Sequence, residues 1–190
     1  MSTKRSLAPG FLVAAPPLGD PNFDRSVVLL AAHGTDGAFG WVLNGREVMM
    51  LGELLVRAEL VPETPDLPGS VRVGGPVSPD QLWLVYRADD RFEAYEGQLE
   101  LGQGVVASAS RQVLEAIIDG SVPESLMALV GYAGWAPGQL ENEIRVGAWL
   151  PTDLDASVVF DVPREELWQA AYERLGTTPI AFTSRTVGSA

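Results

Sequence analysis

The segment from Gly131 to Glu143 is the feature that most constrains how this chain can fold. It reads Gly-Tyr-Ala-Gly-Trp-Ala-Pro-Gly-Gln-Leu-Glu-Asn-Glu, so it combines three glycines, two large aromatic side chains and two carboxylates. A generic helix or strand does not need this mixture, because glycine in the interior of either element weakens it. The segment therefore predicts a specific local structure, and it does not match a known catalytic motif.

The length of 190 residues is typical of a single globular domain. A chain of this size buries roughly 70% of the surface that its unfolded form exposes, so it can build a core without disulfides. We expect a flexible N-terminus at residues 1–10, one domain over residues 11–182 and a flexible tail at residues 183–190. The absence of cysteine excludes disulfides, thiolate metal sites and cysteine nucleophiles.

The charge balance argues against nucleic acid as a direct ligand. Thirteen Lys and Arg residues stand against 25 Asp and Glu residues, for a net charge of −12. Duplex binding requires clustered cations, and the basic residues here are scattered. The apolar run Phe11–Ala15 is shorter than the 7–15 residues or so of a signal peptide, and no window approaches the ~18 of a membrane span. We therefore expect a cytoplasmic protein that does not enter a membrane.

Hydrophobic patterns predict a mixture of strands and helices. A hairpin is expected from two strands, 26–32 and 38–43, joined by a turn at His33–Gly37, and a second one at 91–101 around Gly97. The remaining predicted strands are Phe11–Ala15, Leu82–Tyr86, Leu126–Val130 and Ser157–Phe160. The predicted helices are Glu47–Leu60, a helix from Ser108 or Ser110 to Asp119 with Gly120 after it, a short one from Pro137 to Gly147, and Pro163–Gly176. Hairpins with interspersed helices indicate an α+β fold.

Several separate motifs, in order, resemble the AlgH/YqgE-like family of bacterial proteins. The resemblance covers nearly everything from Phe11 to Gly176. The motifs that carry it are Asp20–Val28, His33 with Gly37–Asn44, Gly74–Val77, Gly131–Trp135, Gly138–Glu143, Trp149-Leu150 and Leu167-Trp168.

This resemblance implies an α+β domain in which bent, mixed and mainly antiparallel sheets form a pseudo-barrel with several flanking helices. It implies no reaction and no ligand, because the family has none established. Members are sometimes labelled transcriptional regulators, which the acidic composition does not support. Relatives often place a histidine at the end of the strand after the Gly-Gly-Pro turn, where this chain has Tyr86, so a mechanism that depends on that histidine is doubtful here.

His33 is the only histidine, so every histidine-dependent mechanism must use it. A Ser-His-Asp arrangement needs a nearby serine and acid, and although Asp36 is near in sequence, Ser26 lies at the other end of the same predicted strand, too far along to meet His33 locally. A turn histidine is therefore favoured. The alternative is a hydrolase or metal-assisted enzyme that uses Asp20, Asp24, His33 and Glu141.

Two loops have weak resemblance to ion-binding sites. Asp20, Asn22 and Asp24 are spaced by two residues as in a calcium loop, but the later glycine and glutamate of that loop are absent, so local turn capping is favoured. Gly74-Gly75-Pro76 lacks the lysine and helix of a phosphate loop and indicates a tight turn. We predict no metal site and no cofactor.

The aromatic residues of the Gly131–Glu143 segment leave two interpretations open. They either line a groove together with Trp149 or belong to the core, and the core is favoured because aromatic side chains are commonly buried. We also expect Arg25 to pair with Glu141 or Glu143, and a buried pair of that kind would be mainly structural unless a cleft exposes it. The tentative ligand-binding residues are Asn22, Arg25, His33, Tyr132, Trp135, Gln139 and Glu141.

The function predicted on this basis is a non-enzymatic binding or regulatory domain with an aromatic-lined groove. Its partner would be an unidentified small molecule or a protein. The hydrolase described above is the first alternative, and a transcriptional regulator that binds DNA is the second.

Overall fold

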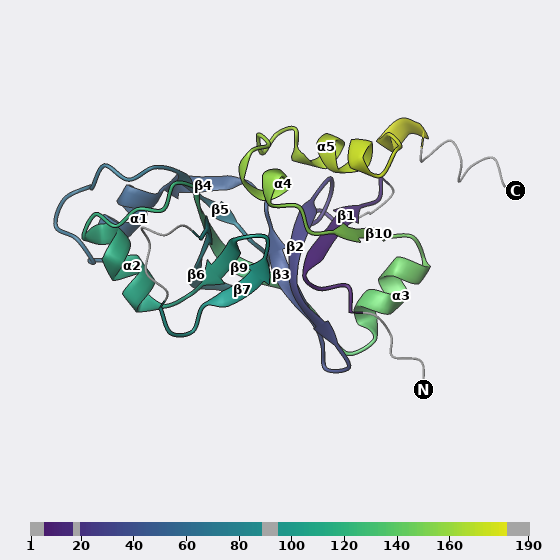
Figure 1. Cartoon of the computed structure of the whole chain (residues 1–190), viewed down its shortest axis with the longest axis horizontal. Coiled ribbons are helices and arrows are strands. Elements are labelled where there is room, and N and C mark those ends of the chain that lie inside the picture. The colour runs from purple at the N-terminus through teal and green to yellow at the C-terminus, as the bar shows by residue number, and fades with distance from the viewer. Residues whose placement is uncertain (1–5, 17–19, 89–94, 182–190) are drawn as a thin grey trace, which may run out of the picture. The chain divides into compact units, whose positions relative to one another are not determined.

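The computed structural model describes residues 6–16, 20–88 and 95–181. The chain divides into two compact units, one made of Met1–Asn44 with Ala133–Ala190 and the other of Gly45–Tyr132. Each unit combines mainly antiparallel strands with helices (Figure 1). This architecture confirms the α+β class.

The first unit is built on antiparallel strands. They are β1 (Gly10–Ala14), β2 (Val27–Gly34), β3 (Gly37–Val42) and β10 (Trp149–Asp153), in the order β10-β1-β2-β3. The last residues of β9 (Leu126–Trp135) pair with β3, from Ala133 to Trp135. The hairpin of β2 and β3 was predicted correctly, but its turn is shorter than expected, because β2 continues through His33. His33 is therefore a strand residue.

Helices cover both faces of β1. These are α3 (Gln139–Arg145), which packs on β3 and β10, and α5 (Leu167–Arg174), which packs on β1 and β2, with α4 (Ala156–Phe160) beside α5. Figure 1 shows α3 and α5 on opposite sides of β1. All five residues of β1 are buried in consequence, which explains its unbroken apolar sequence.

The second unit has its own strands and core. It contains β4 (Glu47–Met50), α1 (Leu51–Arg57), β5 (Ser70–Val73), β6 (Val77–Arg87), β7 (Leu99–Gly102), β8 (Val105–Ser108), α2 (Arg111–Ile118) and the first part of β9. The strands pair in the order β4-β5-β9-β6-β8-β7, and only β5 and β9 are parallel. Its core side chains are Leu51, Val71, Leu84, Tyr86, Val106, Val113, Ile117 and Ala128.

Two predicted elements are of the wrong type. The residues from Glu47 to Met50 are not helical but form β4, which pairs with β5, and the helix begins only at Leu51. Conversely, Ser157–Phe160 is helical, because Asp155 accepts a hydrogen bond from the Ser157 amide and caps α4. Both errors arise where tertiary pairing or capping overrides the hydrophobic pattern.

Several helix ends follow the sequence signals. Ser110 caps α2, and Gly120 follows the helix at φ +101°. Gly147 and Gly176 end α3 and α5 in the same left-handed conformation. The helices begin later than predicted, since Pro137 precedes α3 and Pro163 precedes α5.

Two further strand predictions need correction. The strand expected at Leu126–Val130 continues to Trp135 as β9. The hairpin predicted at 91–101 falls partly outside the described residues, and the strand at Leu99 turns at Gln103 and Gly104 to pair with β8. Within the described ranges neither unit's strand order closes on itself, so the pseudo-barrel stays a prediction, as do the domain boundaries.

Candidate functional site

The Gly131–Glu143 segment forms a buried aromatic cluster around one carboxylate. The indole nitrogens of Trp135 and Trp149 each donate a hydrogen bond of 2.8 Å to Oε2 of Glu143. The two rings lie 5.9 Å apart in an edge-on arrangement, and the ring of Phe23 packs against both. Trp135 is 6% exposed and Trp149 is 2% exposed, so both indoles belong to the core.

Polar contacts fix the start of α3 against this cluster. Gln139 donates from Nε2 to Oε1 of Glu143 at 2.9 Å and accepts from the Ala136 amide at 3.0 Å. Gly138 precedes the helix with φ +75°, a conformation that glycine adopts without strain. The mixture of glycine, tryptophan and glutamate thus satisfies every indole N–H of the cluster, which a buried tryptophan requires.

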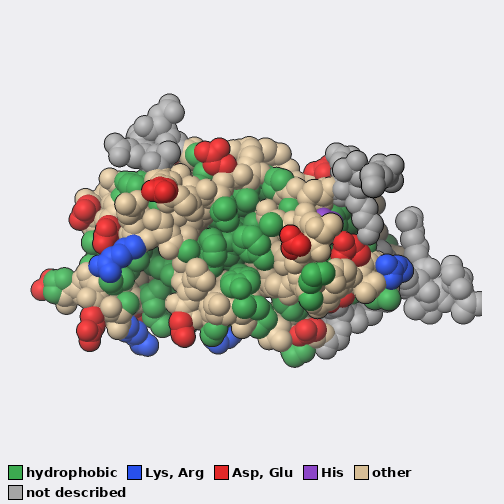
Figure 2. Space-filling view, turned by 90° about the horizontal axis from the view of Figure 1, so that it is seen from below, with side chains coloured by type: hydrophobic (Ala, Val, Ile, Leu, Met, Phe, Trp, Pro, Cys, Tyr) green, Lys and Arg blue, Asp and Glu red, His purple; other side chains and the backbone are tan. Residues whose placement is uncertain are grey.

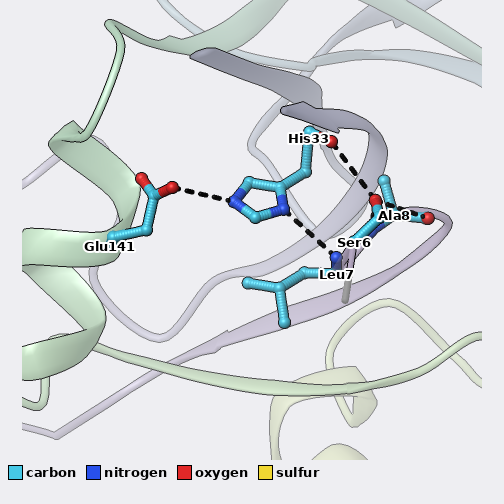
Figure 3. A network of polar contacts seen from close by, with 5 residues as sticks. All are labelled: Ser6, Leu7, Ala8, His33 and Glu141. Atoms are coloured by element: carbon cyan, nitrogen blue, oxygen red, sulfur yellow. Dashed lines mark hydrogen bonds and ion pairs between the residues drawn. The ribbon is translucent and has the colours of Figure 1, made fainter. Parts of the chain in front are cut away.

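His33 links the N-terminal segment to α3 (Figure 3). Its Nδ1 accepts a hydrogen bond of 3.2 Å from the Leu7 amide, and its carbonyl oxygen accepts one of 3.2 Å from the Ser6 hydroxyl. On the other side of the ring, Nε2 lies 3.4 Å from Oε1 of Glu141. That separation is long for a hydrogen bond, and we regard it as an electrostatic contact.

The Leu7 amide occupies Nδ1 of the imidazole, and Nε2 is buried beside Glu141 without a hydrogen bond to any described residue. An Nδ1 that accepts an N–H carries no proton, so the neutral ring has its proton on Nε2, which faces the Glu141 carboxylate. The side chain is only 7% exposed. His33 therefore lacks the free, accessible nitrogen that a general base presents to a substrate.

The Asn22–Arg25 loop adopts a strained but well-bonded conformation. Asp20 accepts hydrogen bonds from the backbone and side-chain nitrogens of Asn22, as local turn capping predicts. Arg25 has φ +51°, and its carbonyl oxygen accepts a hydrogen bond of 2.9 Å from Asn44. The amide of Val27 donates to the same Asn44 side chain, so this asparagine holds the loop on both sides of Ser26.

A pocket of about 530 Å³ opens beside this loop, between Arg25 and α5. The guanidinium carbon of Arg25 lies 5.8 Å from the ring centre of Trp168, within the range of a cation–π contact. The indole N–H of Trp168 donates to the carbonyl oxygen of Ala14 at 2.8 Å, which fixes the ring. Asp24 and Glu173 add carboxylates to the lining.

The structure separates the tentative site residues into different places. Asn22 and Arg25 belong to the loop, and Arg25 lines the pocket. His33 contacts Glu141, whereas Trp135 and Gln139 surround Glu143. Tyr132 pairs with Val77 in the second unit.

The ion pair expected between Arg25 and Glu141 or Glu143 is wrong. Arg25 lies over Trp168 instead, and the contacts of the two glutamates described above are with other residues. The sequence reasoning also missed Trp168 as a site residue. The sequence clue to Trp168 was an aromatic residue directly after Leu167 in a predicted helix. In the structure Leu167 is the buried first residue of α5, and Trp168 is exposed enough to line a pocket.

Acidic side chains lie on the surface of the protein. Figure 2 shows Asp and Glu side chains spread over the face in view, among apolar and polar ones. Among the described residues, no group of three His, Asp or Glu side chains is placed to hold a metal ion. None of the helices in the described ranges is long and apolar enough to cross a membrane.

The chain is a small α+β protein, and comparison with known proteins identifies its family. The AlgH-like family model matches residues 11–180, and the chain belongs to this family. A UPF0301 protein of Anaeromyxobacter sp. strain K is 44% identical over 93% of this chain and 91% of its own length. A UPF0301 protein of Stenotrophomonas maltophilia is 37% identical over 95% of each chain.

Solved structures agree with this assignment. The solution structure of the AlgH protein from Pseudomonas aeruginosa is 35% identical, with a TM-score of 0.78 over 100% of this chain and 97% of its own. A crystal structure of a Corynebacterium diphtheriae protein is 25% identical, with a TM-score of 0.71 over 92% of this chain and 90% of its own.

Proposed function

We propose that this protein is a non-enzymatic binding domain that holds a small ligand in the pocket between the Asn22–Arg25 loop and α5. The observation that carries the proposal is the Arg25 guanidinium, which lies over the Trp168 ring at the wall of this pocket. A cation backed by an aromatic face, inside an apolar concavity of several hundred Å³, is a common arrangement in ligand sites. A regulatory role would follow if ligand binding changed the affinity for a protein partner.

The rigidity of both walls supports the proposal. The Trp168 ring is fixed by its hydrogen bond to Ala14, and the loop that carries Arg25 is fixed by Asn44. A preorganised site loses less conformational entropy when it binds a ligand, so more of the interaction energy contributes to affinity. The aromatic wall of the proposed groove is thus Trp168, whereas Trp135 supports the fold.

The proposed binding role is favoured over the hydrolase alternative by the surroundings of His33. A hydrolase needs an accessible base near a nucleophile, whereas His33 is covered and contacts Leu7 and Glu141. Asp24 lines the pocket, but Asp20 is engaged with Asn22. We therefore propose that Asn22 shapes the loop and that Arg25 contacts the ligand.

The test is a thermal-shift screen of small metabolites against the wild type and Arg25→Gln. Arg145→Gln is the matched control, because it removes the same charge from α3, outside the pocket. A ligand of this pocket should bind the wild type and the control alike and bind Arg25→Gln about tenfold or more weakly, since a charged hydrogen bond is lost. The proposal is overturned if no ligand of the screen depends on Arg25.

A further inference from the structure

The pocket beside Arg25 presents charges of both signs on an apolar lining. Arg25 supplies a cation, and Asp24 and Glu173 supply carboxylates. The rest of the lining is largely apolar and includes Trp168, Pro179 and Ile180. The pocket is thus complementary to a ligand that carries both charges and an apolar group.

Arg25 and Asp24 are adjacent in sequence, yet within the described part of the chain they form no ion pair with each other. Among the described residues the guanidinium of Arg25 makes a cation–π contact with the Trp168 ring and no hydrogen bond, so its N–H groups stay available to a ligand. Asp24 likewise has no hydrogen bond or ion pair to any described residue. Glu173 accepts one hydrogen bond at Oε1, from Gln169, which leaves its other oxygen available.

The alternatives to a zwitterion fit these charges less well. A phosphate or another multivalent anion would meet two lining carboxylates on a protein of net charge −12. A neutral apolar ligand would desolvate one cation and two carboxylates without replacing their hydrogen bonds to water. A ligand with one carboxylate and one ammonium group offers an acceptor to the cation and donors to the carboxylates, so it replaces the hydrogen bonds that both make to water.

We propose, on the basis of the proposed function, that the ligand is a free α-amino acid with an apolar side chain. Its carboxylate would accept hydrogen bonds from Arg25, and its ammonium group would donate to Asp24 and Glu173. Its side chain would lie against Trp168 and Ile180. A pocket of about 530 Å³ accommodates such a molecule.

The experiment is isothermal titration of the wild-type protein with leucine and phenylalanine and with analogues that each lack one group. For leucine these are 4-methylpentanoate, which lacks the ammonium group, and leucinamide, which lacks the carboxylate. We expect saturable binding of an apolar amino acid and binding at least about tenfold weaker for both analogues, because each loses a charged hydrogen bond. The dipeptide Leu-Leu tests whether a peptide is accepted in place of the free amino acid.

Two variants test which residue of the pocket binds which charged group of the ligand. Arg25→Gln should bind leucinamide and leucine alike, and Asp24→Asn should bind 4-methylpentanoate and leucine more alike than the wild type does. Arg145→Gln should keep the wild-type preferences, and circular dichroism verifies that each variant is folded.

The outcomes separate the two proposals. If the analogues bind as well as leucine, or if only other ligands bind in an Arg25-dependent way, the amino-acid inference is overturned and the proposed function stands. A preference for Leu-Leu over leucine also overturns the inference. If no tested molecule binds in an Arg25-dependent way, both are overturned.

Discussion

Glu143 is the residue on which the aromatic cluster of the first unit depends. Its carboxylate accepts three hydrogen bonds, two from the indoles of Trp135 and Trp149 and one from Gln139. A half-buried carboxylate of this kind is stable because its acceptor capacity is used by several donors. The carboxylate in turn satisfies two indole N–H groups that are otherwise costly to bury.

Glu143→Gln should lower the free energy of unfolding by about 1–3 kcal/mol, because the amide nitrogen must then face an N–H donor and leave a bond unmade. The measurement is urea denaturation followed by tryptophan fluorescence. Glu115→Gln is the control, since it removes only an exposed i,i+4 contact with Arg111 on α2, worth a few tenths of a kcal/mol. Equal losses in the two variants would contradict this role of Glu143.

Among the secondary-structure elements, β9 contains a position that requires glycine. Its Gly131 has φ +72°, and a Cβ built there would lie 2.4 Å from the carbonyl oxygen of Gly75. Only glycine combines this left-handed conformation with so close an approach of another backbone. Gly131 thus has a steric role, whereas at Gly138 of the same segment no heavy atom lies within 4 Å of the position of an added Cβ.

Gly131→Ala should destabilise the protein by at least about 2 kcal/mol more than Gly104→Ala. Gly104 has a similar φ of +75°, but no heavy atom lies within 4 Å of the position that an alanine methyl group would take there. The pair of variants therefore separates steric overlap from backbone strain. Both free energies come from urea denaturation. Similar losses would show that the approach of Gly75 is not the cause.

At the scale of the molecule, each unit buries a tyrosine in its core. Burial raises the pKa of Tyr86 in the second unit to about 12, and it does the same to the pKa of Tyr172 in the first. Tyr86 also accepts a hydrogen bond from Gln98, and the Tyr172 hydroxyl donates to Ala14 at 3.1 Å. Both cores therefore favour the neutral phenol.

Stability should fall as the pH rises from 10 towards 12. In this window the unfolded tyrosines, with the usual pKa of about 10, release protons that the folded ones retain. The loss is at most ~1.4 kcal/mol per pKa unit for each tyrosine. Urea denaturation of the wild type, Tyr86→Phe and Tyr172→Phe at pH 9 to 11.5 measures it. Each variant should show a shallower decline, and equal slopes in all three would contradict the assignment.

Much of the local structure could be predicted from sequence because it depends on local chemistry. Ser110 and Gly120 bound α2 as their preferences for caps and left-handed conformations predict. The apolar run Phe11–Ala15 indicated a strand, and β1 spans Gly10–Ala14. By contrast, the pattern at Glu47–Met50 favoured a helix, and pairing with β5 made it a strand.

The candidate site was predictable only in part. Asn22 and Arg25 were chosen from the sequence, and Arg25 lines the pocket. Trp168 was missed because it lies 143 positions after Arg25, and no spacing rule connects residues so far apart. Trp135 was correctly favoured as a core residue, but its bond to Glu143 depends on how α3 packs.

The sequence by itself determined the α+β class, the family, the acidic charge and the caps of several helices, because these depend on composition and on neighbours along the chain. Only the tertiary structure decided that His33 contacts Leu7 and Glu141 and that Arg25 lies over Trp168. Side-chain partners of this kind are set by packing between elements, and the chain can supply many partners of equal chemistry. The pocket exists because strand pairing and helix packing bring one loop and one distant helix together.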